Sequence, residues 1–196
     1  MTRERIYLAG PDVFLPDAIE IGNNKKALCQ HYGFVGLFPF DNEVGPSLSG
    51  EPLDHLIYRE NIAMIRQADL AIINLTPFRG PSADVGSVFE LGFAHGLGKP
   101  VFGYTNVTSD LVERVAEHCP GLRMDADGLW RDEDGMSVEN FGNADNLMID
   151  ACLSGAGRPL IRVPVARSER YRDLRGFEEC LRLADRELRG PLRRAS

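Results

Sequence analysis

The sequence lacks the patterns that mark common nucleotide and metal sites. No Gly-x-Gly-x-x-Gly follows the first expected strand and no Walker sequence occurs, so dinucleotide or triphosphate binding is not expected. The 196 residues include only four cysteines and four histidines, and none of them has the spacing of paired metal ligands. We therefore expect no metal, no organic cofactor, and cysteines that stay reduced in the cytosol.

Long apolar runs and an excess of positive charge are also missing. No run approaches the length of a membrane span, and the first five residues lead directly into an expected strand, without a signal peptide. The net charge of −7 disfavours nucleic acid and anionic membranes as partners. These features predict a cytoplasmic protein that binds neither membrane nor nucleic acid.

Strands and helices alternate along the chain. This alternation predicts an α/β fold, namely a flavodoxin-like doubly wound, mostly parallel sheet of about five strands with helices on both faces. The third strand is a nearly unbroken apolar run, which is typical of a strand buried on both faces. We expect strands at 5–9, 34–38, 70–75, 101–104 and 159–165, and helices at 18–32, 53–69, 85–99, 143–153 and 168–189.

Two regions of the chain are less regular. Residues 105–140 have no clear period and are rich in Asp, Glu and Gly, so we expect an irregular arm or a short hairpin there. We expect residues 1–155 to form the α/β domain. Residues 156–196 then form a C-terminal extension whose amphipathic helix packs on the same domain.

Acidic residues gather in the loops that should follow the strands. Open α/β sheets bind ligands outside the carboxyl ends of their strands. The loops at that edge carry Asp12, Phe14, Asp41 and Asp84, and Glu90 lies just inside the third helix. Acids suit a neutral, hydroxyl-rich ligand such as a sugar or a nucleoside, whose hydroxyls donate hydrogen bonds.

A structural role can account for Asp84 but not for Glu90. Asp84 stands where the helix should begin, so a role as N-cap explains it without any ligand. Glu90 has bulky apolar neighbours, and a buried carboxylate must be paired, hydrogen-bonded or turned to a cleft. Gly86 and Gly92 would leave room for a ligand beside it, although helical glycines also serve close packing.

Four segments together resemble the nucleoside 2-deoxyribosyltransferase family. The resemblance covers residues from about 5 to 155, in the same order and with similar spacing. The most specific segment is Asp84-Val-Gly-Ser-Val-Phe-Glu-Leu-Gly92. The others are Ile6-Tyr-Leu-Ala-Gly-Pro-Asp-Val-Phe14, Ala68-Asp-Leu-Ala-Ile-Ile-Asn74 and Asn146-Leu-Met148.

The resemblance implies a retaining exchange of bases on 2′-deoxynucleosides. Glu90 would be the nucleophile that forms a covalent deoxyribosyl ester, and its place near a helix N-terminus favours the ionised form. Tyr7 would orient Glu90, and Asp84 would hold deoxyribose hydroxyls. Asn146 and Met148 would complete the site of a neighbouring subunit in a homo-oligomer with shared active sites. Without the resemblance, Tyr7 is a core aromatic, Asn146 a helix cap and Met148 a core residue.

The substrate-binding residues implied are Asp84, Asn61, Asn146, Met148, Phe14, Asp12 and Gly86. Some members of the family carry an acid where this chain has Asn61, and an amide cannot supply a proton as a carboxylic acid does. The base preference therefore stays open.

Two other functions also stay open. One is an N-glycosidase that hydrolyses nucleosides or nucleoside 5′-monophosphates on the same scaffold. The charge of Asp84 disfavours the monophosphates, because it would face a phosphate. The other is a non-catalytic nucleotide sensor, which is less favoured. The implied partners are 2′-deoxynucleosides and free nucleobases.

Overall fold

The structure is a computed structural model that describes residues 3–41 and 50–190. A five-stranded sheet lies at its centre, and all neighbouring strands run parallel in the order β2-β1-β3-β4-β8. This is the strand order of flavodoxin-like sheets, so the predicted fold class is confirmed. The strands are β1 (Arg5–Ala9), β2 (Val35–Leu37), β3 (Leu70–Asn74), β4 (Val101–Thr105) and β8 (Ile161–Arg162).

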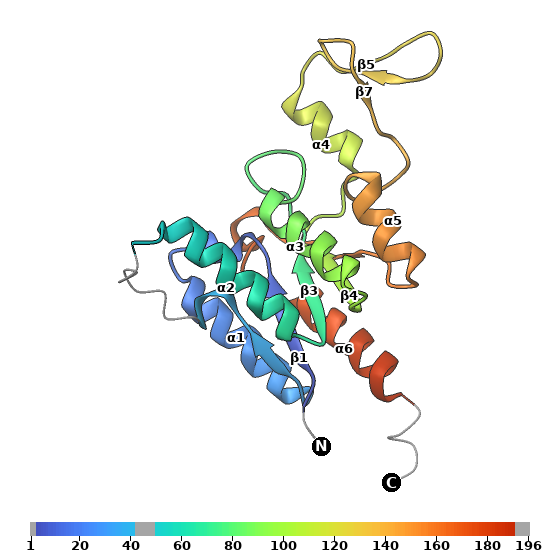
Figure 1. The fold of residues 1–196 in the computed structure, drawn as a ribbon. Helices are drawn as coiled ribbons and strands as arrows, with labels where there is room; N and C mark the ends of the chain where they lie inside the picture. Colours follow the sequence, from blue (N-terminus) through green and yellow to red (C-terminus); the bar gives the residue numbers. More distant parts are fainter. Residues whose placement is uncertain (1–2, 42–49, 191–196) are drawn as a thin grey trace.

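Helices cover both faces of the sheet (Figure 1). Helices α2, α3 and α5 pack on one face, and α1 and α6 pack on the other. None of the helices in the described part of the chain is long and apolar enough to cross a membrane. The helices are α1 (Ala18–His31), α2 (Leu53–Gln67), α3 (Val85–Gly96), α4 (Leu111–His118), α5 (Leu147–Gly155) and α6 (Arg175–Arg189).

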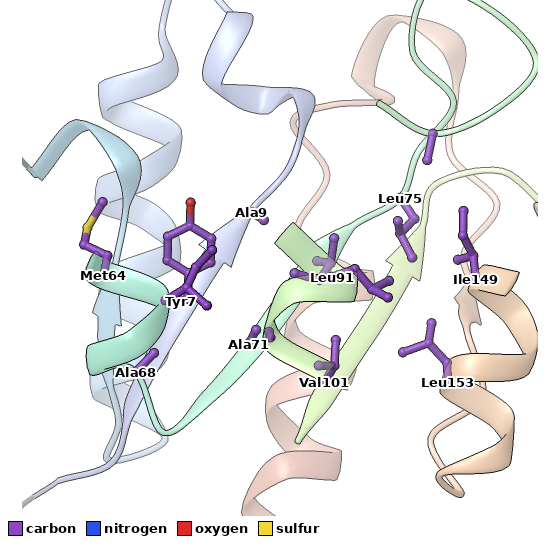
Figure 2. Packing of buried hydrophobic residues seen from close by; sticks show 14 residues of the cluster. Tyr7, Ala9, Met64, Ala68, Ala71, Leu75, Leu91, Val101, Ile149 and Leu153 are labelled. Atoms are coloured by element: carbon purple, nitrogen blue, oxygen red, sulfur yellow. The ribbon is translucent and has the colours of Figure 1, made fainter. Parts of the chain in front are cut away.

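Alternate residues of the central strands enter different hydrophobic layers. On β1, Tyr7 and Ala9 pack with α2, α3 and α5, whereas Ile6 and Leu8 pack with α1 and α6. Successive side chains of a strand point to opposite faces, which explains this division. Figure 2 shows the first layer, with Tyr7 among its members. The strand thus directs Tyr7 to the face of the sheet that carries α3.

Residues 105–140 are more ordered than the sequence predicts. They contain α4 and a three-stranded antiparallel sheet, which lies beyond α4 in Figure 1. Asp110 and Glu113 form a capping box at the start of α4. Backbone amides donate to the side chains of Asp125 and Asp132 in the two turns of the small sheet. Strands of two residues show no period, which is why the sequence does not reveal β5 (Arg123–Met124), β6 (Trp130–Arg131) and β7 (Ser137–Val138).

The C-terminal region completes the sheet and covers one face. Strand β8 pairs with β4 at the sheet edge, and Phe177 and Leu181 of α6 lie in the core beside Phe102 of β4. Helix α6 begins later than expected, because residues 167–174 form a 3-10 turn and a loop. That segment is held by Arg172, which pairs with Asp17 at 2.8 Å.

Candidate active site

Tyr7 in the middle of β1 meets Glu90 of α3. The Tyr7 hydroxyl donates a hydrogen bond of 2.6 Å to Glu90 Oε1, although the two residues are 83 positions apart. Tyr7 comes from β1 and is completely buried, whereas Glu90 comes from the second turn of α3 and keeps some exposure. The pairing that the family resemblance implied is therefore present in the geometry, with the phenol as donor and the carboxylate as acceptor.

Burial controls the ionisation of this pair. Loss of solvent raises the pKa of Glu90 to about 7; the Tyr7 hydrogen bond lowers that pKa, and the charge of Asp84 raises it. The position near a helix N-terminus was expected to favour ionisation, but desolvation outweighs it. Burial and the Glu90 charge also raise the pKa of Tyr7, so the phenol keeps its proton and remains a donor.

Asp84 caps helix α3 and also lies near enough to Glu90 for its charge to act on it. It is the N-cap of α3, and its Oδ2 accepts bonds of 2.9 Å from both the amide and the hydroxyl of Ser87. Both of these bonds end on one oxygen, so Oδ1 remains available to a ligand. A Cβ at Gly86 would lie 3.1 Å from Oδ2, so a side chain there would crowd the carboxylate. Asp84 therefore has the expected capping role, and only its Oδ2 takes part in the cap.

Helix α2 carries Asn61 one turn after an aromatic residue that meets α3. Tyr58 lies one turn before Asn61 on α2, and its ring is 6.3 Å from that of Phe89. Phe89 also stacks on Phe93 at 6.3 Å. Phe89 directly precedes Glu90, so this contact brings the α2 face that carries Asn61 towards the same part of α3.

Phe14 belongs to an aromatic stack that the sequence did not predict. Its ring lies parallel to that of Phe78 with centroids 5.1 Å apart, and the Arg79 guanidinium lies over both rings. Tyr171 meets Phe78 edge-on at 6.1 Å. Phe14 is 56% exposed and so offers a flat apolar surface. The sequence position of Phe78 and Arg79 could have indicated a role at the site, since both lie in the loop after β3, at the edge of the sheet where a ligand is expected.

Asp12 does not occupy the place expected of a substrate-binding residue. It is fully buried, with Oδ2 2.6 Å from Lys25 Nζ and Oδ1 accepting from Asn74 Nδ2 at 3.0 Å. Both carboxylate oxygens are therefore occupied by the protein itself, and Asp12 serves to join η1 (Pro11–Phe14), α1 and β3. Asp41, another acid of this edge, pairs with Lys26 and accepts from the Phe38 amide at 2.9 Å.

Asn146 and Met148 lie at the start of α5. Asn146 is its N-cap: Oδ1 accepts from the Met148 amide at 3.0 Å, and Nδ2 donates to Glu139 at 2.8 Å. These bonds do not involve Glu90 or Tyr7 of the same chain. Met148 is 72% exposed, so it is not the core residue that its type alone would suggest.

The described residues form no cluster of metal ligands. Among residues 3–41 and 50–190, no group of three or more His, Cys, Asp or Glu side chains is arranged to hold a metal ion. At the Tyr7–Glu90 pair a phenol donor orients a carboxylate, and a carboxylate held in this way can act as a nucleophile.

Three proteins show what the chain is similar to. A structure described as a 2-desoxiribosyltransferase from Leishmania mexicana is 37% identical, with a TM-score of 0.58, over 74% of this chain and 85% of that one. An uncharacterized protein of Schizosaccharomyces pombe is 30% identical over an alignment of 164 positions, and the match covers 78% of this chain and 78% of that one. A conserved protein from Enterococcus faecalis V583, at 16% identity and a TM-score of 0.53 over 93% of this chain and 99% of that one, shares the fold.

The family assignment rests on the larger part of the chain. Residues 6–148 match the family described as nucleoside 2-deoxyribosyltransferase. The matched range contains Tyr7, Asp84 and Glu90, and it ends at Met148. This chain belongs to the nucleoside 2-deoxyribosyltransferase family.

Proposed function

We propose that the chain transfers 2-deoxyribose between nucleobases through a covalent ester on Glu90. The observation that carries this proposal is the 2.6 Å hydrogen bond from the buried Tyr7 hydroxyl to Glu90 Oε1. Family membership and the name of the Leishmania mexicana relative support the same activity. The expected substrates are 2′-deoxynucleosides and free nucleobases.

The reaction consists of two displacements at the anomeric carbon. Tyr7 holds Oε1, so Oε2 is the oxygen that attacks the anomeric carbon while the bond to the first base breaks. The departing base takes up a proton from solvent, and the sugar remains as an ester of Glu90. A second base then attacks from the face that the first one left, loses its proton and regenerates the carboxylate. Two inversions give net retention.

The raised pKa of Glu90 sets the pH range of this chemistry. Only the ionised carboxylate can attack, and a pKa of about 7 means that the ionised fraction falls as the pH decreases through neutrality. Bound substrate places an electron-poor sugar carbon beside Glu90, which favours the charged form. Tyr7 stabilises the same form by its hydrogen bond.

Asp84 and Asn61 provide the polar contacts to the two halves of the substrate. Oδ1 of Asp84 accepts from a deoxyribose hydroxyl, and a negative charge at this position disfavours a 5′-phosphate on the same sugar. The amide of Asn61 can both donate to and accept from a base edge. We therefore expect free nucleosides to be better substrates than their 5′-monophosphates.

The working species is at least a dimer in this proposal. Asn146 and Met148 contribute to the pocket of a neighbouring subunit, which agrees with the high exposure of Met148. Large apolar side chains near both parts of the site are exposed, notably Val85 and Phe89 on α3 and Phe141 before α5. Exposed apolar groups of this kind are typical of contact surfaces, and symmetric homo-oligomers are the usual result.

Base exchange distinguishes the transferase from the hydrolase. The protein is incubated with deoxyinosine, with and without free adenine, and the products are separated by chromatography. Formation of deoxyadenosine, dependent on adenine and lost in Glu90→Ala, is the expected result. Release of hypoxanthine at the same rate without adenine, and no deoxyadenosine with it, would show that water is the acceptor.

A further inference from the structure

A cavity of about 490 Å³ lies between three segments that are far apart in the sequence. The loop after β3 contributes Arg79, α4 contributes Arg114 and His118, and the segment at η3 (Arg167–Glu169) contributes Arg167 and the adjoining Arg170. Glu117 is the one acid among its lining residues. This concentration of positive charge stands in a chain whose net charge is −7.

One of the arginines is part of the wall of the cavity. Arg114 is buried, donates to the carbonyls of Pro81 and Ser109 at 2.6 Å and to that of Ala144, and lies 3.6 Å from Asp145 Oδ2. Its charge and its hydrogen bonds are therefore used within the protein. It braces the loop after β3 against α4 and the start of α5.

The other three arginines have capacity left for a ligand. Within residues 3–41 and 50–190, no carboxylate forms an ion pair with Arg79, Arg167 or Arg170. The Nε of Arg170 is buried and has no hydrogen-bond partner in that part of the chain. A buried donor without an acceptor is unfavourable, so this guanidinium has hydrogen-bonding capacity that the described part of the chain does not use.

The walls of the cavity are held in place without a ligand. The Tyr171 hydroxyl donates to the Pro77 carbonyl at 2.6 Å, which ties the η3 segment to the loop after β3. Asn106 Nδ2 donates to the Arg170 carbonyl at 2.7 Å. His118 Nδ1 lies 2.8 Å from the Arg114 carbonyl and donates to it, which ties the ring to the backbone of α4. A site with fixed walls loses little entropy when it binds.

We propose that this cavity binds the phosphoryl group of a small phosphorylated ligand, held by Arg79, Arg167 and Arg170. Guanidinium groups match the oxygens of a phosphate with paired, charge-assisted hydrogen bonds, and several of them together select a multiply charged anion. The site is separate from Glu90 and does not depend on the proposed deoxyribosyl transfer. Arg79 is its link to the expected nucleoside pocket, because the same guanidinium stacks on Phe14.

Two sources of the phosphoryl group are compatible with this chemistry, namely free phosphate and a phosphate ester. Calorimetric titrations with inorganic phosphate and with deoxyadenosine 5′-monophosphate separate them. Similar affinities would identify a site for the phosphoryl group alone. If the monophosphate binds markedly more tightly than inorganic phosphate, and binds more weakly to protein already saturated with deoxyadenosine, the ligand is a nucleotide whose base reaches the nucleoside pocket past Arg79.

The variant Arg167→Gln/Arg170→Gln tests the site, and Arg186→Gln is the matched control. Arg186 is an exposed arginine of α6 that lines a different cavity. We expect the double variant to bind both probes at least about tenfold more weakly and the control to bind as wild type does. Equal affinities in wild type and double variant, or an equal loss in the control, would overturn the proposal.

Deoxyribosyl transfer in phosphate-free buffer separates this proposal from the catalytic one. The double variant lacks no group of the Tyr7–Glu90 site and should keep wild-type exchange there, with an unchanged thermal unfolding midpoint. Loss of phosphate binding with exchange intact supports the phosphoryl site. An inactive wild type would contradict the proposed function and leave the binding measurement fully interpretable.

Discussion

The hydroxyl of Tyr7 lies 2.6 Å from Glu90 Oε1, and this contact joins the first strand to the third helix. Tyr7→Phe keeps the ring and its packing but removes the donor that lowers the pKa of Glu90. A hydrogen bond to a charged group contributes about 1.5–3 kcal/mol, so we expect kcat/KM at pH 7 to fall roughly 10- to 100-fold. The acidic limb of the pH profile, near pH 7 in wild type, should move to higher pH.

Tyr32→Phe provides the control for that variant. It removes a bond of the same kind, from the Tyr32 hydroxyl to Glu178 Oε1 at 2.8 Å, on the opposite face of the sheet. Its kcat/KM and pH profile should match wild type. A Tyr7→Phe enzyme with an unshifted acidic limb would show that the phenol does not stabilise the Glu90 carboxylate.

Stability should depend on pH through Glu90. Its folded pKa of about 7 lies above the value of 4.5 for a free side chain, so the folded state binds more protons between these values. The free energy of unfolding must then decrease as the pH rises from about 4.5 to about 7. Glu90→Gln removes this slope. Because Glu90 keeps some exposure, we expect the variant to gain about 1–2 kcal/mol relative to wild type between pH 5 and pH 8.

Urea unfolding of both proteins at pH 5 and pH 8 measures this difference. Glu60→Gln on α2 is the control, since that carboxylate pairs with Arg59 at the surface. A stability difference between wild type and Glu90→Gln that is the same at both pH values would contradict the raised pKa.

Much of the fold can be predicted from the sequence, because its signals are local. The apolar residues of β1 and β3 alternate between two covered faces, and Pro or Gly follows most strands. The arm around Trp130 and helix α4 could not be found in this way. Their strands are two residues long, and the turns depend on side-chain bonds from Asp125 and Asp132.

The contacts of the site are harder to predict from the sequence, because they join residues that are far apart in it. The partnership of Tyr7 and Glu90 came from the family resemblance, since no local pattern joins residues 83 positions apart. The internal role of Asp12 could not be predicted either, because its ion pair with Lys25 joins different elements of the fold. One signal was present: Lys25 lies midway between Ile21 and Cys29 on the buried face of α1. A lysine at such a position needs a carboxylate partner.

Asp84→Asn separates the two roles of Asp84. Asparagine is as good an N-cap as aspartate, so the thermal unfolding midpoint should change little. The loss of the charge should weaken the contact to the sugar and lower kcat/KM for deoxyadenosine by at least about tenfold. It should also lower the pKa of Glu90, because the Asp84 charge raises it.

The same variant tests the preference for free nucleosides. In wild type, deoxyadenosine should have the higher kcat/KM and its 5′-monophosphate the lower one, and Asp84→Asn should narrow that ratio. A wild-type enzyme that is more efficient on the monophosphate would contradict this role of Asp84 and favour the glycosidase alternative.

Mixing two inactive variants tests the shared site. Asn146→Ser keeps a capping side chain at the start of α5 but removes the amide, and Glu90→Ala removes the nucleophile. In a mixed dimer one pocket carries both changes and the other carries neither. Random exchange of subunits should restore activity to roughly a quarter of the wild-type level.

The mixture needs proof that subunits have exchanged, which native mass spectrometry of differently tagged variants provides. If mixed dimers form and activity stays absent, Asn146 serves its own chain. If wild type is active as a monomer, the requirement for a dimer is wrong.

The most direct test of the central claim is the covalent intermediate on Glu90. Wild-type protein is incubated with deoxyinosine in the absence of an acceptor base, quenched in acid, digested and analysed by mass spectrometry. The account predicts one added deoxyribosyl group on the peptide that contains Glu90, its disappearance when adenine is added before the quench, and its absence in Glu90→Gln. Active enzyme with no adduct under these conditions, or an adduct on a different side chain, would contradict Glu90 as the nucleophile.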